Sequence, residues 1–371
     1  MTASLDDIRT RLRRFAEQEA AGVSPLYEHL AARAADDDDV ASLLTAAPAG
    51  FGFPTLLLAA VHRVVQTEPF HELVDYYPSM GGANGVDART WPLWREFVLE
   101  RADKVRARIA EHTTQTNEVR RAALLYPAVA LAAKQAGAPV GLLEVGCSAG
   151  LLLNLDKYAY RYQTQASGQV AAGPPKAALG LHCALELAPG ATLPAIPKKL
   201  AVAAKVGLDR APVDLGDEDA AAWLEACIWA DQPERQRLFS TAAAVQRKSG
   251  APELVRGDAV GGLAEAAARV PADVPLVVLT SHVLSYLPAE QRLAFVAGLA
   301  ALAAERPLWW VSQESYRAGL HLVLPDRDDL VPRAGTQASG VLGLVSWRGG
   351  SADAVALART AMHGERMTWL V

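Results

Sequence analysis

The chain has 371 residues, a hydrophobic content of 51%, a charged content of 21% and a formal net charge of −5. This composition is typical of a globular protein long enough for one large or two ordinary domains, and it excludes a disordered chain. A negative net charge argues against a nucleic-acid-binding protein, because contacts to phosphates need a positive field.

The cysteines and the N-terminus indicate in which cellular compartment the protein is expected. Cys147, Cys183 and Cys227 lie far apart, so the sequence indicates neither a disulfide framework nor a zinc site. The N-terminal MTASLDDIRTRLRRF has no apolar segment behind its arginines, and no apolar run approaches the ~20 residues that span a bilayer. We therefore expect a cytoplasmic protein that acts on a small molecule and has no membrane, nucleic-acid or metal partner. The oligomeric state is left open.

Helical patterns dominate the first third of the chain. Apolar residues recur at helical spacing from Ile8, and Ser24-Pro25 is a typical helix start. The turn-rich segment 76–85, YYPSMGGANG, predicts an ordered loop that either closes over a substrate or simply joins two helices. We expect residues 1–114 to form a helical domain or lid. Further helices are predicted over 54–65, 91–109 and 118–135.

Strand and helix patterns alternate after Pro139. This alternation predicts an α/β fold with a doubly wound, mostly parallel, Rossmann-like sheet over residues 115–371. A Gly- and Pro-rich segment near 158–199 is an expected insertion. The last two strand candidates would close the sheet as an antiparallel hairpin. The strand candidates are VGLLEVG, LAVAAKVGLD, PELVRGDA, VPLVVLTSH, PLWWVSQE, GVLGLVSWRG and ERMTWLV, and the intervening helices are expected over 217–229, 259–268 and 289–304.

The segment GLLEVGCSAGLLLNLDKY, residues 141–158, has two incompatible interpretations. Its centre matches G-x-S-x-G, the nucleophile elbow of serine hydrolases, with Ser148 as nucleophile and a possible order Ser148, Asp258, His282. Read from Glu144, it resembles the nucleotide loop of S-adenosylmethionine methyltransferases. The second interpretation accounts for more residues, because a hydrolase elbow follows several strands and this one would follow only helices.

In the nucleotide interpretation, acids at strand ends hold the ligand. Glu144 would accept a hydrogen bond from the ligand's ammonium group, and Asp209 would accept both ribose hydroxyls. Asp258 and Ala259 follow the third strand, where adenine would lie. Gly146 and Gly150 would let the backbone approach the ligand, and Ser148 occupies the place of a middle glycine. The long gap between Gly146 and Asp209 requires the insertion.

Four blocks carry a family resemblance over nearly the whole chain. They are QTNEVRRAALLYPA, YYPSMGG, LLEVGCSAGLLLNLDKYAY and GLDRAPVDLGDEDAAAWLEACIWADQPERQRL. Together they resemble the bacterial family known as domain of unknown function twenty-three thirty-two. The resemblance implies a methyltransferase-like sheet with an additional N-terminal helical part, and it implies no substrate. Leu153 stands where the resemblance suggests Asn or a small residue, so it assigns no role to Asn154.

Methyl transfer needs an oriented acceptor and, where the acceptor arrives protonated, a base. His282 is the best base candidate because its ordinary pKa lies near neutrality, although a structural histidine is an equal alternative. Glu314 would orient His282 or bind a cationic substrate group, and Tyr286 would form a pocket wall. Asn117 and Glu118 are predicted substrate contacts on one helix with Arg121, which shares a helix face with Glu118. These residues either line the crevice or make a salt bridge from the helix to the sheet.

The leading hypothesis is a small-molecule methyltransferase that uses S-adenosylmethionine. The alternatives are a protein that keeps this fold as a nucleoside-binding sensor or as another enzyme, and a serine hydrolase that uses Ser148.

Overall fold

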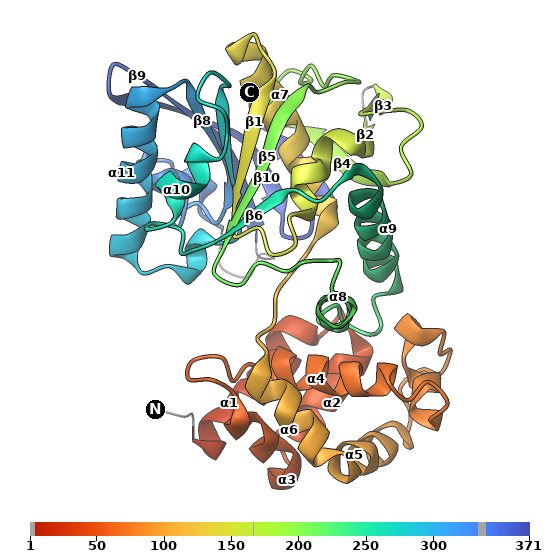
Figure 1. Cartoon of the computed structure of the whole chain (residues 1–371). Coiled ribbons are helices and arrows are strands. Elements are labelled where there is room, and N and C mark those ends of the chain that lie inside the picture. Colours follow the sequence, from red (N-terminus) through yellow and green to blue (C-terminus); the bar gives the residue numbers. More distant parts are fainter. Residues whose placement is uncertain (1–3, 166, 333–338) are drawn as a thin grey trace. The chain divides into compact units, whose positions relative to one another are not determined.

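The computed structural model describes residues 4–165, 167–332 and 339–371, and its contacts divide into two compact units (Figure 1). The helical unit comprises Met1–Thr116 and Leu215–Ser240, and the sheet unit comprises Asn117–Asp214 and Thr241–Val371. The sequence places the division between residues 114 and 115. It does not anticipate that residues 215–240 return to the helical unit.

The helical unit begins with a well-capped helix. Ser4 accepts a hydrogen bond from the Asp7 amide, and the Asp7 side chain accepts one from the Ser4 amide, which forms a capping box. The expected start at Ser24-Pro25 is confirmed, because Ser24 caps the helix and Pro25 is its first residue. The helices are α1 (Leu5–Phe15), α2 (Pro25–Ala34), α3 (Asp38–Ala41), α4 (Pro54–Gln66), α5 (Thr90–Glu100), α6 (Ala102–Glu111) and α8 (Glu218–Ala226). Short π or 3-10 turns are η1 (Ala16–Ala20), η2 (Ser42–Ala46), η3 (Glu72–Tyr76) and η4 (Pro78–Met80).

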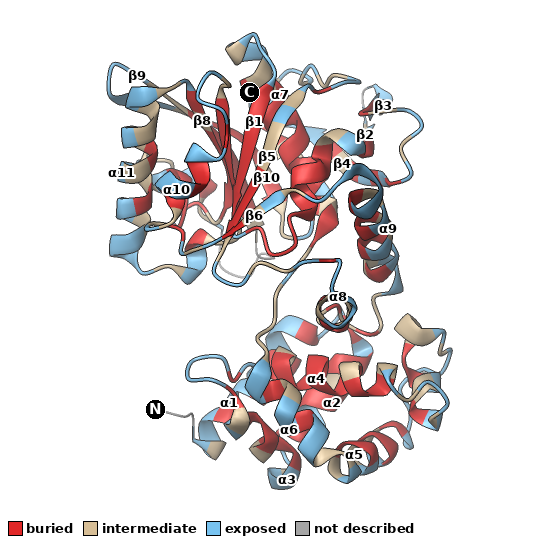
Figure 2. Ribbon diagram, in the orientation of Figure 1, coloured by how far each residue is buried: buried red, intermediate tan, exposed pale blue. Residues whose placement is uncertain are grey.

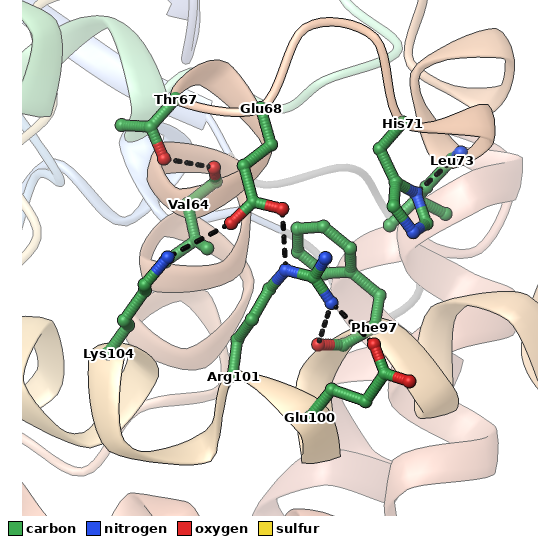
Figure 3. A network of polar contacts seen from close by, with 9 residues as sticks. All are labelled: Val64, Thr67, Glu68, His71, Leu73, Phe97, Glu100, Arg101 and Lys104. Carbon is green, nitrogen blue, oxygen red and sulfur yellow. Dashed lines mark hydrogen bonds and ion pairs between the residues drawn. The ribbon is translucent and has the colours of Figure 1, made fainter.

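A network of charged side chains joins α4, α5 and α6 (Figure 3). Glu68, just after α4, accepts hydrogen bonds from Arg101 Nε (2.7 Å) and Lys104 Nζ (3.1 Å). The Arg101 guanidinium also lies 4.1 Å from the centre of the Phe97 ring. The side chains of Arg101 and Glu68 are 17% and 25% exposed. Because Arg101 is largely shielded from water, its contact with the Phe97 ring stabilises the unit more than an exposed contact of this kind would.

Residues 215–240 are an integral part of the helical unit. Trp223 of α8 is buried in its core and donates a hydrogen bond to the Thr113 carbonyl (3.0 Å). His62, fully buried on α4, lies 3.1 Å from the Ala226 carbonyl through Nδ1 and 2.9 Å from Ser79 Oγ through Nε2. Ser79 belongs to the YYPSMGG segment, which here connects helices within this unit.

The sheet unit contains one 11-stranded sheet, mostly parallel, in the order β3-β2-β4-β11-β10-β9-β8-β7-β1-β5-β6. Its last five strands in this order, β8-β7-β1-β5-β6, are parallel to one another. Among them β1 and β7 are almost wholly buried, whereas β6 at the edge is largely exposed (Figure 2). The strands are β1 (Val140–Val145), β2 (Ala159–Thr164), β3 (Gly168–Ala172), β4 (Gly180–Leu187), β5 (Val202–Asp209), β6 (Glu253–Arg256), β7 (Leu276–Ser281), β8 (Leu308–Glu314), β9 (Ser339–Arg348), β10 (Ser351–Ala361) and β11 (Arg366–Trp369).

Helices cover both faces of the sheet. Adjacent residues of a strand point to opposite faces, and on β8 Trp309 donates to Gln135 of α7 while Trp310 contacts Phe295 of α11. Helix α7 therefore lies on one face and α11 on the other, with α10 beside α11. The helices of this unit are α7 (Ala122–Ala136), α10 (Leu263–Ala268) and α11 (Ala289–Glu305), and α9 (Pro233–Ser249) contains the boundary between the units.

One expectation about the sheet is wrong. The segments GVLGLVSWRG and ERMTWLV do not form a hairpin with each other, because β10 pairs between β9 and β11. The segment 158–199, expected as an insertion, contains β2, β3 and β4, which extend the sheet beyond β11. Among the described residues, no helix is long and apolar enough to cross a membrane.

Candidate functional site

The loop after β1 is held in a strained conformation. Gly146, Ser148 and Gly150 all have positive φ, at 76°, 50° and 68°. The Gly146 amide donates to the Leu208 carbonyl (2.8 Å), and the Ser148 amide donates to Asp209 Oδ2 (2.8 Å). Because Leu208 and Asp209 end the neighbouring strand β5, the turn is fastened to the sheet at the C-terminal edge of the parallel strands.

The two glycines of this loop are required by protein packing. A Cβ at Gly146 would lie 2.5 Å from the Val283 side chain, and one at Gly150 would lie 2.9 Å from Pro252. Such contacts are too close, so both positions need glycine even without a ligand. The expectation that they serve ligand approach stays a prediction, although Gly146 is itself exposed.

Asp209 and Asp258 lie at the ends of neighbouring strands. Each Asp209 oxygen accepts one backbone hydrogen bond, from Ser148 and from Ala211 (2.9 Å), and Asp209 is half-buried. Asp258 is exposed, and the amides of Val260 and Gly261 lower its pKa by donating to Oδ1. The next residue, Ala259, is buried in the core.

A short segment before α7 contributes polar groups to the same edge. Asn117 Nδ2 donates to Ser148 Oγ (2.9 Å). Glu118, buried at 4% exposure, caps η5 (Val119–Arg121) by accepting from the Arg120 amide, and it faces His363 Nδ1 at 3.6 Å. Arg121 is also buried, and its Nε donates to the Met362 carbonyl after β10 (2.9 Å). Glu118 thus lies beside the turn between β10 and β11, and its role as a substrate contact or as part of a salt bridge stays a prediction.

His282 is the second strained residue of the site, with φ 55°. Its amide donates to the Gln313 carbonyl (3.0 Å), and its Nε2 lies 2.8 Å from Gln313 Nε2. The Gln313 amide oxygen accepts from Ser281 (2.7 Å), so the amide NH2 group is the one that faces His282. Nε2 is therefore the acceptor, and the ring proton of neutral His282 lies on Nδ1.

Burial shifts the pKa of three groups here. It lowers the pKa of His282 to about 3, assisted by the positive charges of Arg121 and His363. It raises the pKa of Glu314 to about 7, against the effect of the Val283 and Leu284 amides and Arg121. It also raises the pKa of Glu144 well above its usual range, with the charge of Asp209 adding to the effect. Burial therefore favours the neutral form of all three side chains.

The structure brings most of the predicted site residues to one edge of the sheet. Tyr286, on η7 (Leu284–Tyr286) just after β7, is 80% exposed. The loops after β1 and β7 touch, because Val283 fills the space over Gly146. Asn117, Ser148 and Asp209 are joined by hydrogen bonds.

Sequence reasoning missed Gln313 and Thr360. Gln313 links Ser281, His282 and Thr360 (3.2 Å) across three strands. The sequence did contain a signal for Gln313, because the polar triplets TSH and SQE end two adjacent parallel strands. Thr360 offered none, since β10 was not predicted.

No group of three or more His, Cys, Asp or Glu residues in the described ranges could hold a metal ion. No match was found among the curated proteins or among the solved structures. A family model described as an uncharacterized protein conserved in bacteria, DUF2332, matches residues 9–369. This match covers nearly the whole chain, including both units and every site residue discussed above. The chain belongs to the bacterial DUF2332 family.

Proposed function

We propose that the chain is an S-adenosylmethionine-dependent methyltransferase that acts on a small molecule, built on a methyltransferase-like variant of the doubly wound fold. One observation carries this proposal. Numbered along the chain, the five parallel strands β6-β5-β1-β7-β8 lie in the order third, second, first, fourth, fifth. In open sheets of this order, ligands bind beyond the strand C-termini where the order reverses, here between β1 and β7.

The residues at that point support the proposal. Ser148 and His282, on the loops after β1 and β7, are two of the three non-glycine residues with positive φ in the described part of the chain. Strained backbone of this kind gathers at functional sites, where the surrounding structure holds it in place. An acid stands at the end of β1, β5 and β6: Glu144, Asp209 and Asp258.

The donor set fits the chemistry of the cofactor. Glu144 Oε2 is buried without a hydrogen-bond partner among the described residues, as an acceptor for an ammonium group would be before binding. Each oxygen of Asp209 accepts only one backbone hydrogen bond in the described structure, which leaves lone pairs for ribose hydroxyls. S-Adenosylmethionine supplies a methyl group on a positively charged sulfur. Glu314, whose pKa is about 7, would take the acceptor's proton, and His282 would hold the acceptor through Nδ1–H.

Ligand-induced melting shifts test this function. A ligand at ~100 times its dissociation constant adds about 2.7 kcal/mol of stability, which raises the melting temperature by several degrees. We expect this shift with S-adenosylhomocysteine for wild type and for Ser148→Ala, and a strongly reduced shift for Asp209→Ala and Asp209→Asn. Equal shifts in wild type and both Asp209 variants would contradict the assignment of Asp209. Binding without any turnover in an acceptor screen would favour the sensor alternative.

The hydrolase alternative has one observation in its favour, the strained φ of Ser148 in a strand-to-helix turn. The remaining triad does not assemble around it. His282 Nε2 faces Gln313, and Asp258 is exposed and bound to the amides of its own loop. Loss of a measurable esterase activity in Ser148→Ala would revive this alternative.

A further inference from the structure

A line of polar side chains, the relay, leads to the turn after β1. It consists of Lys205 in β5, Asn154 in η6 (Leu151–Lys157) and Gln246, which lies in the part of α9 that belongs to the sheet unit. Asn154 is 1% exposed and Gln246 is 2% exposed. Burying an amide side chain costs free energy unless its hydrogen bonds are made, so the partners of these residues are informative.

The hydrogen bonds of the relay run in one direction. Lys205 Nζ donates to Asn154 Oδ1 (3.0 Å), and Asn154 Nδ2 donates to Gln246 Oε1 (2.8 Å). Gln246 Nε2 then donates to the Ala149 carbonyl (2.9 Å). A lysine ammonium can only donate and a backbone carbonyl can only accept, so the two ends of the relay fix the orientation of both amide groups between them.

The lysine at the start of the relay is anchored. Lys205 Nζ lies 2.6 Å from Asp156 Oδ1, and the two side chains are 18% and 7% exposed. Breaking an ion pair that is largely shielded from water is strongly destabilising, because it leaves a buried charge behind. The Lys205 ammonium therefore has a fixed place from which it orients Asn154.

The relay ends at a turn that is also attached to β5. Ala149 is fully buried, so its carbonyl depends on a donor from the protein, and Gln246 supplies one. The preceding residue, Ser148, has a φ of 50° and donates its amide to Asp209 Oδ2 (2.8 Å). Strained backbone persists only where its surroundings hold it. Gln246 and Asp209 thus hold adjacent residues of one strained turn.

We propose that Lys205, Asn154 and Gln246 are positioning residues for the bound nucleoside. The relay holds the Ala149 carbonyl, the turn places the Ser148 amide, and that amide orients Asp209, to which the ribose hydroxyls are assigned. The three side chains act through the turn and do not themselves contact the ligand. The inference rests on the proposed function for the identity of the ligand, but the hold on the turn does not depend on it.

Calorimetric titration of the full chain tests the relay at its last residue. Gln246→Met keeps the length of the side chain and removes both of its hydrogen bonds. We expect the affinity for S-adenosylhomocysteine to fall about tenfold, the effect of losing one hydrogen bond at the turn. Gln291→Met, the same change at an exposed residue of α11, should bind as wild type does. Equal affinity in wild type and Gln246→Met would overturn the proposal.

Hydrogen exchange separates a hold on the turn from a general loss of stability. In the full chain without ligand, we expect the amides of residues 146–150 to exchange about tenfold faster in Gln246→Met than in wild type. The amides of β8 and β9 should exchange at the same rate in both proteins. Exchange that is equally faster throughout the sheet would mean that Gln246 supports the fold as a whole, and would overturn the proposal.

The far end of the relay gives a second test, which decides even if Gln246→Met does not fold. Lys205→Met removes the donor that orients Asn154, and we expect a smaller loss of affinity, about threefold. Lys205→Arg keeps a donor and an ion-pair partner for Asp156, so it should bind more tightly than Lys205→Met. Wild-type affinity in Lys205→Met, or equal losses in the two variants, would contradict the relay.

The two measurements separate this inference from the proposed function. A wild type that does not bind S-adenosylhomocysteine would overturn the proposed function. Faster exchange confined to residues 146–150 in Gln246→Met would even then support the hold of the relay on the turn. A wild type that binds, beside relay variants that bind equally well, would overturn the relay and leave the proposed function standing.

Discussion

At the scale of single residues, the site depends on polar groups whose protonation is set by burial. His282 illustrates what a sequence can and cannot give. Its position at a strand end was predictable from TSH, but its tautomer and its low pKa depend on Gln313 and on burial. The sequence made His282 the best base candidate with a structural histidine as an equal alternative, and burial lowers its pKa while it raises that of Glu314.

Titration of the histidine rings by NMR tests this conclusion. Burial lowers the pKa of His282 to about 3 and that of His62 to about 4. A histidine that is neutral when folded contributes stability above its unfolded pKa of ~6.5 and loses it as the pH falls towards the folded pKa. We expect both rings to stay neutral at pH 5, with signals assigned by His282→Gln and His62→Gln. A His282 midpoint near 6.5 would contradict the account.

The buried carboxyl of Glu314 gives the opposite pH dependence. Its folded pKa of about 7 lies above the unfolded value, so the folded state binds more protons and stability falls as the pH rises from ~4.5 to 7. Glu314→Gln should remove about 3 kcal/mol of this fall, as an upper limit, in denaturant unfolding. Glu290→Gln, the same change at an exposed residue of α11, is the control. Parallel pH profiles for wild type and Glu314→Gln would refute the shift.

Asp209 is expected to matter for folding as well as for binding. Asp209→Ala removes the acceptor of the Ser148 amide in the turn after β1 and of the Ala211 amide just after β5, which should cost about 1–3 kcal/mol. Asp258→Ala also removes two such bonds, but in an exposed loop, so its effect should be smaller. Chemical denaturation of the two variants gives the comparison, and equal losses would argue against a special role for the Asp209 turn.

At the scale of elements, the loops after β1 and β7 pack so closely that only glycine fits at position 146. Gly146→Ala places a Cβ in the left-handed region, which costs ~1–2 kcal/mol, and adds overlap with Val283 worth about 1–3 kcal/mol more. Gly168→Ala, also at positive φ but with open space around it, should cost only the ~1–2 kcal/mol of backbone strain. Val283→Ala should recover the difference in a double-mutant cycle. No coupling between the two positions would show that the loops do not touch.

The sequence predicted those elements whose pattern is set by burial on both faces. β1, β5, β7 and β8 are apolar runs that end in polar residues, and all four were predicted. β10 was missed because its alanines, in SADAVALARTA, favour no strand pattern. β4 carried an alternation that could have been recognised, since Leu181, Cys183 and Leu185 are buried and the residues beside them are not.

At the scale of the whole molecule, the division of the chain follows contacts that no local pattern reveals. Asp219 pairs with Arg63 (2.7 Å) and Arg108 (3.0 Å), and Asp231 accepts from Ser24. Each pair joins residues more than 100 positions apart. Sequence reasoning without such pairs assigned 215–240 to the sheet unit.

A truncation tests this division. Residues 1–116 alone lack Trp223 and the partners of Arg63, Arg108 and Ser24, so we expect no cooperative thermal transition in circular dichroism. In the full chain, Trp223→Ala should cost about 3–5 kcal/mol, because it empties a buried site. A fragment 1–116 that melts cooperatively near the full-length temperature would contradict the assignment.

The central claim is that the edge of the sheet between β1 and β7 binds S-adenosylmethionine. Calorimetric titration of the full chain with S-adenosylhomocysteine tests it most directly. The account predicts saturable binding near one ligand per chain, weakened in Asp209→Asn. The absence both of heat and of any melting shift with S-adenosylhomocysteine would contradict the claim. The strained turn at Ser148 would then be explained by packing alone.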